Sequence, residues 1–406
     1  MDELLKAADA QRVRADRRYL HACAETGFDL HDTFAYVWKQ LTDMGLAPRR
    51  CGKCGIIADI GEGEEGVLLR ADMDALPIRE EADVPFASEN GCMHACGHDL
   101  HTAMLLEAAR ILKGRERELT GRVRLMFQPA EEVLLGAADM LENGLLEGLH
   151  IRGAFMIHVL TDVELPAGTV IVSAPGVSAP AAGMFEIRIQ GKGCHGAMPH
   201  TGVDPISIAA HTVINLQQIQ TRELSVTQPC ALTIGMLQAG DTANVIPDSA
   251  LLRGSLRAFD DETHQQLIRR VEEIAGGTAE LFGGSAQMRL LGGAPTLVND
   301  AALSTMALSA LRELLGEERV LLSADLGGDA KKSSGSEDFA NVSHAAPSLM
   351  VALAAGEPSR GYASPAHHPR ARFDESVLPV GATVYACLAL KGLALRETCP
   401  GPGSLT

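Results

Sequence analysis

Four short segments of the sequence place potential metal ligands either at the end of an apolar run that is typical of a buried strand or at the start of a predicted helix. The candidate ligands are Asp72 and Asp74, Cys96 and His98, Glu131 and Glu132, and His158. In open α/β sheets, binding sites gather at the carboxyl ends of the strands, so we expect these side chains to lie together. Sulfur, nitrogen and oxygen ligands in combination suit Zn²⁺ or Mn²⁺ better than Ca²⁺ or Mg²⁺.

Each of these segments has an ordinary explanation when it is taken alone. A single histidine at a strand end, such as His158, is more often a structural hydrogen-bonding residue. Adjacent carboxylates such as Glu131 and Glu132 are usually solvated, and Cys96 beside His98 could be a buried thiol at a helix start. The coincidence of all four at predicted strand ends or helix starts favours a metal site.

The elements that must carry these residues alternate between helix and strand over the first 180 residues, as in an α/β domain. Helices are predicted at 3–24 and 33–44, and a third is predicted to start near His98 or Asp99. Buried strands are predicted at 66–72, 123–128 and 151–159. These strands are nearly continuous apolar runs, which indicates a mostly parallel sheet covered by helices on both faces.

The pattern changes near residue 181 and becomes β-α-β-β-α-β, the order of a ferredoxin-like fold. Helix and strand patterns of the first kind resume after residue 292. We therefore predict a catalytic α/β domain formed by residues 1–180 and 293–406, with an inserted α+β domain at residues 181–292.

Composition excludes several classes of partner. The formal net charge of −17 and an aromatic content of 4% argue against binding to nucleic acid or to an anionic membrane. The longest apolar stretch, residues 377–395, is interrupted by Lys391 and is predicted to be a buried helix. The charged start of the chain and nine scattered cysteines favour a cytoplasmic, reducing location.

The pair Cys51-Gly-Lys-Cys54 offers an alternative chemistry, because its spacing is that of half a zinc finger or of a redox motif. The sequence contains no second pair of this kind. A redox protein would depend on both thiols and would be insensitive to chelators, and we consider this interpretation the weaker one.

Seven motifs in the order of the chain resemble those of the metal-dependent aminoacylase and carboxypeptidase family. They are LLRADMDALPI, MHACGHDLHTAMLLEAARIL, FQPAEE, GKGCHGAMPH, NVIPD, SGSEDFA and HHPRARFDE. The branch that they resemble most holds hippurate hydrolases, indoleacetyl-amino-acid hydrolases and N-acetyl-diaminopimelate deacetylases. The resemblance implies a catalytic domain with two divalent metal ions, either Zn or Mn, and an inserted ferredoxin-like lid domain that forms a homodimer.

The same resemblance assigns residues to the metal centre. It implies that the ligands are Cys96, His98, Glu132, His158 and His367, with Cys96 as the bridging ligand. His368 stays an alternative to His367, although the family spacing favours His367. Glu131 is implied as the general base that takes a proton from a metal-bridging water. Asp72 and Asp74 are interpreted as carboxylates that orient ligands, with direct ligation open.

The inserted domain is implied to complete the site. His195 resembles a donor to the tetrahedral oxyanion that acts in the partner subunit, and Asn244 and Arg257 resemble ligands of a substrate carboxylate. The predicted function is hydrolysis of the amide bond of a small N-acyl amino acid. A dipeptidase or carboxypeptidase using the same site is the alternative enzyme, and a non-catalytic metal-dependent binding protein is the alternative outside enzymes.

Overall fold

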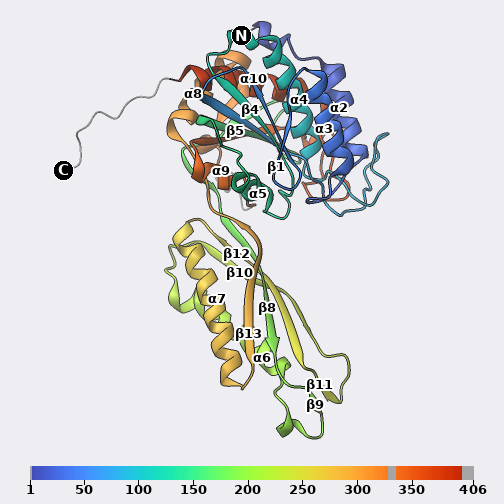
Figure 1. The fold of residues 1–406 in the computed structure, drawn as a ribbon, viewed down its shortest axis with the longest axis vertical. Coiled ribbons are helices and arrows are strands. Elements are labelled where there is room, and N and C mark those ends of the chain that lie inside the picture. The colour runs from blue at the N-terminus through green and yellow to red at the C-terminus, as the bar shows by residue number, and fades with distance from the viewer. Residues whose placement is uncertain (1, 328–334, 396–406) are drawn as a thin grey trace, which may run out of the picture.

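Two β-sheets, at opposite ends of an elongated molecule, organise the chain in the computed structural model, which describes residues 2–327 and 335–395 (Figure 1). The larger sheet has eight strands. Their order is β1 (Arg49–Cys51), β2 (Gly55–Ile60), β4 (Arg122–Gln128), β3 (Glu65–Asp72), β5 (His150–Leu160), β16 (Ser348–Ala354), β6 (Val170–Val172) and β15 (Val320–Leu322). The four central strands, β4, β3, β5 and β16, are parallel, which confirms the predicted α/β class.

Helices bury both faces of this sheet. Their bounds are α2 (Ala10–Ala22), α3 (His31–Asp43), α4 (His98–Gly114), α5 (Gly136–Glu142), α8 (Ala301–Leu315), α9 (Ala340–Ala345) and α10 (Leu378–Ala394). Alternate residues of each strand face different layers: Leu69 and Phe155 pack in the cluster with α4 and α10, and Leu68 in the cluster with α5 and α9. Burial on both faces explains why the strands are nearly continuous apolar runs.

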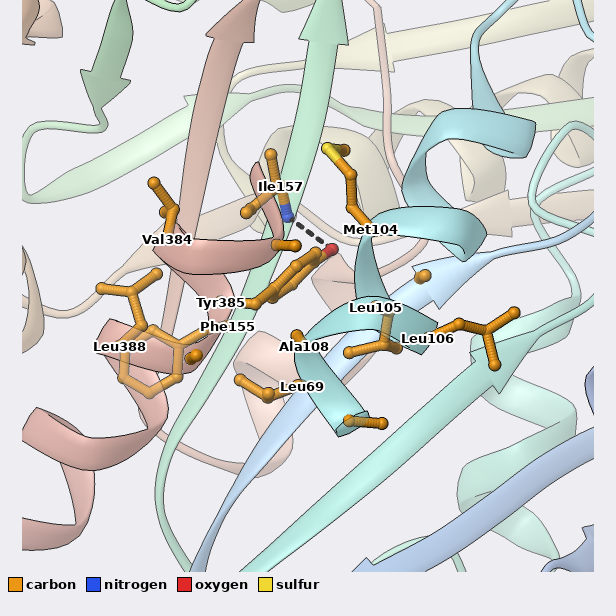
Figure 2. Close-up of a cluster of buried hydrophobic side chains, with 14 of the residues drawn as sticks. Leu69, Met104, Leu105, Leu106, Ala108, Phe155, Ile157, Val384, Tyr385 and Leu388 are labelled. Carbon is orange, nitrogen blue, oxygen red and sulfur yellow. Dashed lines mark hydrogen bonds between the residues drawn. The ribbon is translucent and has the colours of Figure 1, made fainter. Parts of the chain in front are cut away.

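The core between α4, α10 and the sheet includes a polar contact made by Tyr385 (Figure 2). Its hydroxyl donates to the carbonyl of Arg70 at 2.7 Å and accepts from the backbone N–H of Ile157 at 3.1 Å. These two residues lie near the carboxyl ends of β3 and β5. The tyrosine therefore ties together the two strands that lead to Asp72 and His158.

Helix α10 is the apolar stretch predicted to be a buried helix. A window within 375–394 is long and apolar enough to cross a membrane, but 72% of that window is buried inside the molecule. The helix packs against α4, α8 and the central strands. Its apolar character is accounted for by this core position.

The single helix predicted at residues 3–24 is wrong in one respect, because the chain forms α1 (Asp2–Leu5) and then α2 from Ala10. The side chain of Asp9 accepts from the backbone N–H groups of Gln11 and Arg12, which caps α2 and starts a new helix. Periodicity alone does not reveal such a restart.

The second sheet extends away from the first (Figure 1) and has the order β10 (Cys230–Ala239), β12 (Ser249–Ala258), β8 (Ala181–Gln190) and β13 (Ser285–Ala294). All its pairs are antiparallel. Helices α6 (Pro205–Gln218) and α7 (Asp261–Leu281) cover one face. The chain order is thus β-α-β-β-α-β. We call this part, residues 181–294, the inserted lobe.

The chain enters and leaves the inserted lobe through neighbouring strands. β7 (Gly176–Ala179) precedes the lobe and pairs antiparallel with β14 (Leu297–Asn299), which follows it. At the far tip of the lobe, β9 (Cys194–His195) pairs with β11 (Val245–Ile246). Figure 1 places this tip at the end of the molecule opposite the larger sheet.

Candidate metal centre

The start of α4 sets the positions of Cys96 and His98. Gly97 between them has φ +93°, a left-handed conformation that side chains disfavour. A Cβ at this position would lie 2.4 Å from Cγ2 of Val159, so only glycine fits. The sharp turn leaves Cys96 before the helix and makes His98 its first residue, with both side chains buried.

Two of the predicted histidine ligands are oriented by backbone carbonyls. Nδ1 of His98 donates to the carbonyl of Asp74, and Nδ1 of His158 donates to the carbonyl of Val159, both at 2.8 Å. A carbonyl can only accept, so each neutral ring carries its proton on Nδ1. The lone pair is then on Nε2, as in metal-ligating histidines.

A tight turn after β4 carries Glu131 and Glu132. The backbone N–H groups of both residues donate to the buried carboxylate of Asp74, at 3.0 Å and 3.2 Å. Ala130 and Leu134 have φ of 54° and 55° in the same turn. Asp74 thus positions the turn through its carboxylate and His98 through its backbone carbonyl. Both contacts agree with the interpretation of Asp74 as a residue that orients ligands.

The five predicted ligands come together in overlapping groups. Candidate ligand atoms of Cys96, His98 and His158 lie within 4.8 Å of one another, and so do those of Cys96, Glu132 and His367. Cys96 belongs to both groups, and its Sγ lies 3.5 Å from Nε2 of His158. The structure therefore brings together five residues from segments that are far apart in the sequence.

Of the two adjacent histidines in HHPRARFDE, His367 is the one that joins these groups. Its Nε2 lies 3.5 Å from Oε2 of Glu132. Its backbone N–H donates to the carbonyl of Ala95, and its φ is 66°. His368 instead accepts the backbone N–H of Arg370 on Nδ1. The two neighbouring side chains therefore have different partners.

Asp72 and His101 form a buried hydrogen-bonded pair beside the five residues. Nδ1 of His101 donates to Asp72 at 2.6 Å, while its Nε2 accepts the backbone N–H of Val159 at 2.9 Å. Both ring nitrogens of His101 are therefore in use. The second carboxylate oxygen of Asp72 accepts from Arg70 and lies 3.5 Å from Nε2 of His98.

The arrangement of donors fits divalent metal ions. Nε2 of His98 and Oε1 of Glu132 are buried, lie 3.9 Å apart and have no hydrogen-bond partner among the described residues. Burial raises the pKa of Cys96 to about 12 and that of Glu132 to about 7, and lowers the pKa of His158 to about 3. A bound cation favours the thiolate and carboxylate forms and needs the neutral imidazole.

Three residues beside the site were not assigned a role from the sequence. Arg70 is fully buried, and its guanidinium donates to Glu337 at 2.7 Å and to Asp338 at 3.2 Å. Ligand atoms of Glu131, Glu337 and Asp338 lie within 4.8 Å of one another. In the sequence, these residues are marked only by the motif SGSEDFA, which contains Glu337 and Asp338, and by the presence of an arginine inside an apolar strand.

His195 and Asn244 lie at the tip of the inserted lobe, away from the five-residue cluster of the same chain (Figure 1). Both are exposed. The two segments are adjacent, because the N–H of Gly196 donates to the carbonyl of Asn244 at 2.8 Å. The structure therefore brings these two predicted residues to each other but not to the metal ligands of their own chain.

Arg257 occupies the other end of the lobe, near the junction with the larger sheet. Its Nη1 donates to Oγ of Ser336 at 2.7 Å, next to Glu337 in the chain. Arg257 is thus adjacent to the buried acidic segment at the metal centre, whereas His195 and Asn244 are not.

Cys51 and Cys54 are occupied in structural contacts. The thiol of Cys51 donates to the carbonyl of Met140, and the thiol of Cys54 donates to the carbonyl of Phe28. Burial raises the pKa of each to about 11, so little thiolate is present near neutral pH. These contacts argue against the redox alternative.

Comparisons with known proteins agree with this geometry. The model of peptidase family M20/M25/M40 matches residues 68–391. N-acetylcysteine deacetylase of Bacillus subtilis is 35% identical over 92% of this chain and 95% of that protein. IAA-amino acid hydrolase ILR1-like 2 of Arabidopsis thaliana is 37% identical over 93% of this chain and 84% of that protein.

One solved structure is informative about the metal centre. The YXEP protein of Bacillus subtilis, described as a dinuclear metal binding peptidase from the M20 family, is 33% identical to this chain. It superposes with a TM-score of 0.73 over 94% of this chain and 97% of that protein. The resemblance predicted from the seven motifs is confirmed: the chain belongs to peptidase family M20/M25/M40, and it is a metal-dependent hydrolase of that family.

Proposed function

We propose that the protein hydrolyses the amide bond of small N-acyl amino acids with the help of two divalent ions, Zn²⁺ or Mn²⁺. The observation that carries this proposal is the cluster of five potential ligands with a sixth group beside it, the carboxylate of Glu131. A protein that only bound metal would need the ligands but no adjacent base. The names of the relatives that are 35% and 37% identical to this chain over the aligned residues support the substrate class.

In this proposal Cys96, His98 and His158 would hold one ion, and Cys96, Glu132 and His367 would hold the other. When bound, such ions polarise the amide carbonyl and make a water molecule acidic enough to react near neutral pH. Asp74 and the carbonyls of Asp74 and Val159 hold the ligands in orientation.

Glu131 is the proposed general base. Its backbone is fixed by Asp74, and its Oε2 lies 3.9 Å from Nε2 of His98. Burial and the nearby carboxylates of Glu337 and Asp338 raise its pKa, which makes it a stronger proton acceptor. A carboxylate oxygen takes a proton from the attacking water and returns it to the amide nitrogen as the C–N bond breaks.

We propose further that the inserted lobe forms a homodimer and that His195 serves the partner subunit. Most of the exposed large apolar side chains of the described residues lie on this lobe, which favours an interface there. They are Met198, Ile206, Ile214, Val226, Leu237, Val245, Leu281, Phe282 and Leu290. The eight described cysteines are free thiols, which favours the reducing cytoplasm as the location.

His195→Ala is expected to lower turnover by about 10²- to 10³-fold, the usual effect of losing one oxyanion donor, with metal content and fold unchanged. Mixing equal amounts of His195→Ala and Glu131→Gln chains should restore about one quarter of the wild-type rate. Half of the dimers are then heterodimers, and each heterodimer keeps one of its two sites complete. Steady-state rates after subunit exchange, monitored by mass spectrometry, test this. Full exchange without recovery would show that His195 does not act across subunits.

A substrate panel tests the proposed function itself. N-acetyl and N-benzoyl amino acids should be hydrolysed, their carboxamides more slowly, and unacylated dipeptides least. Arg257→Ala should raise KM for the acids about 10- to 100-fold, because a charged hydrogen bond to the carboxylate is lost. The control is Ser336→Ala, which removes a hydrogen-bond partner of Arg257 within the chain. Identical effects of the two substitutions would assign Arg257 a structural role, and dipeptides as the best substrates would overturn the proposal.

A further inference from the structure

One buried carboxylate, that of Asp338, contacts both ends of the turn that carries Glu131 and Glu132. Its Oδ1 accepts from Nε2 of Gln128, the last residue of β4, at 2.6 Å. Its Oδ2 accepts from the backbone N–H of Ala137, in the first turn of α5, at 2.9 Å. Asp338 is fully buried and lies more than two hundred residues further along the chain.

The turn needs such an external restraint. Ala130 and Leu134 both adopt positive φ, a conformation that residues with a side chain seldom take without support. The ends of the turn are also pressed together, since a Cβ on Gly136 would lie 1.6 Å from the carbonyl oxygen of Pro129. Asp338 binds Gln128, just before the point where Pro129 and Gly136 come close, and Ala137, just after it.

Arg70 connects Asp338 to the other side of the metal centre. The guanidinium donates to Asp338 at 3.2 Å, to Oε1 of Gln128 at 2.9 Å and to Asp72 at 2.8 Å. Because Arg70 and Asp72 belong to β3 and Gln128 to β4, the group spans two neighbouring strands.

The chain of contacts continues to the remaining ligand segment. Asp72 accepts from His101 on α4, and His101 accepts the backbone N–H of Val159, the residue after His158. Every link is a hydrogen bond of 3.2 Å or less between buried groups. The network thus joins the Glu131–Glu132 turn to the segments that carry His98 and His158.

We propose that Asp338 is a positioning residue, which, with Arg70, sets the place of Glu132 relative to the other metal ligands and aligns Glu131. This inference rests on the proposed function only for the role of Glu131. Its consequence for Glu132 concerns metal binding and requires no substrate. Asp338, a described residue of the motif SGSEDFA, thereby has a role in the metal centre.

The hydrogen bonds of Asp338 determine which substitution tests its role. All three partners of Asp338 are donors: the Gln128 amide, the Ala137 N–H and the Arg70 guanidinium. Asparagine has the same shape but offers one acceptor and one donor. In Asp338→Asn, one end of the turn therefore loses its acceptor and meets an N–H group instead.

The expected result is a weaker metal site in a folded protein. Asp338→Asn should bind Zn²⁺ about 10- to 100-fold more weakly than the wild type, the usual effect of removing an outer partner of a metal centre. The affinity is measured by titrating the apoprotein with Zn²⁺ against a chromophoric chelator. At saturating metal, kcat should fall by about 10-fold or more with KM nearly unchanged, because the substitution misaligns Glu131 and leaves substrate contacts intact.

A donor–acceptor swap provides the rescue. In the double variant Gln128→Glu/Asp338→Asn, the new carboxylate at position 128 accepts from both Arg70 and the amide N–H introduced at position 338. The carbonyl oxygen of that introduced amide accepts from Ala137, and the total charge of the network is unchanged. The contact of Arg70 Nη2 with Oδ1 of Asp338 is not restored, but Nη2 keeps its shorter hydrogen bond to Glu337 at 2.7 Å. The double variant should recover Zn²⁺ affinity and kcat to within a few-fold of the wild type. A substitution that lowered stability alone would leave the Zn²⁺ affinity of the folded Asp338→Asn variant unchanged, so there would be no loss of affinity for the double variant to reverse.

The matched control is Asp59→Asn, which breaks another Arg–Asp pair on the same sheet. Asp59 accepts from Arg124 at 2.8 Å and 2.9 Å, and Arg124 lies on β4 before the metal-bearing end. This variant should lose stability and keep its Zn²⁺ affinity. Wild-type affinity in Asp338→Asn, or a swap variant that folds but binds Zn²⁺ no better than the single variant, would overturn the inference. The Zn²⁺ titration decides this even if no N-acyl amino acid is hydrolysed.

Discussion

Glu131→Gln is expected to retain both metal ions and to lose turnover by about 10²- to 10⁴-fold, the range typical of general acid–base catalysis. Glutamine has the shape of glutamate but cannot accept a proton. The backbone N–H of residue 131 still donates to Asp74, so the turn should keep its conformation. Steady-state kinetics, with metal content measured by inductively coupled plasma mass spectrometry, separate the two effects.

Glu132→Gln is the matched comparison, since it makes the same chemical change one residue later. Oε1 of Glu132 is buried without a partner among the described residues, and Oε2 lies 3.5 Å from His367. This variant should lose metal, and its activity should recover in part at high metal concentration. Near-normal activity in both variants would show that the roles of the two carboxylates are wrongly assigned.

Removal of the metal ions should abolish activity and lower the melting temperature, and both should return when Zn²⁺ or Mn²⁺ is added back. A ligand that binds only the folded state stabilises it by about 4 kcal/mol when its free concentration is about 1,000 times Kd. The apoprotein also has two carboxylates close together, that of the buried Glu131 and that of the partly buried Glu132. Dialysis against a chelator, followed by calorimetry and activity assays, measures both losses.

Reconstitution also counts the ions, because the two overlapping ligand groups predict two per chain. Activity plotted against added metal should level off when about two ions are bound per chain. A chain that reaches full activity with one ion would contradict the paired centre, and activity that survives complete removal of metal would contradict the proposed chemistry as a whole.

The sequence predicted the parts of the site that local patterns control. Glu132 and His158 lie at or shortly after the ends of apolar strands, and Cys96 and His98 lie at the start of an apolar helix, so the pattern of the adjoining residues identifies each element. Once the strands are known to be parallel, their carboxyl ends meet at one edge. Bringing these four residues together therefore required no knowledge of distant contacts.

The remaining features depend on contacts that periodicity does not encode. Asp338 meets Gln128 although more than two hundred residues separate them, and nothing local to either residue indicates the partner. His367 and His368 have the same side chain, and the positive φ of His367 is part of what distinguishes them. Arg70 could be identified as unusual inside an apolar strand, but its buried acidic partners follow only from the fold.

The pairing of β7 with β14 has an evolutionary consequence. Because these strands are antiparallel neighbours, the chain leaves the part of the molecule that holds the larger sheet, and returns to it, at points about one strand spacing apart, roughly 5 Å. A segment whose ends are adjacent can be lengthened, replaced or removed with little disturbance to the host fold. The five proposed metal ligands all lie outside this insertion, whereas His195 and Asn244 lie within it. On the proposed roles, descent with modification can therefore change the residues that reach the substrate from this segment, while the metal ligands of the host fold are retained.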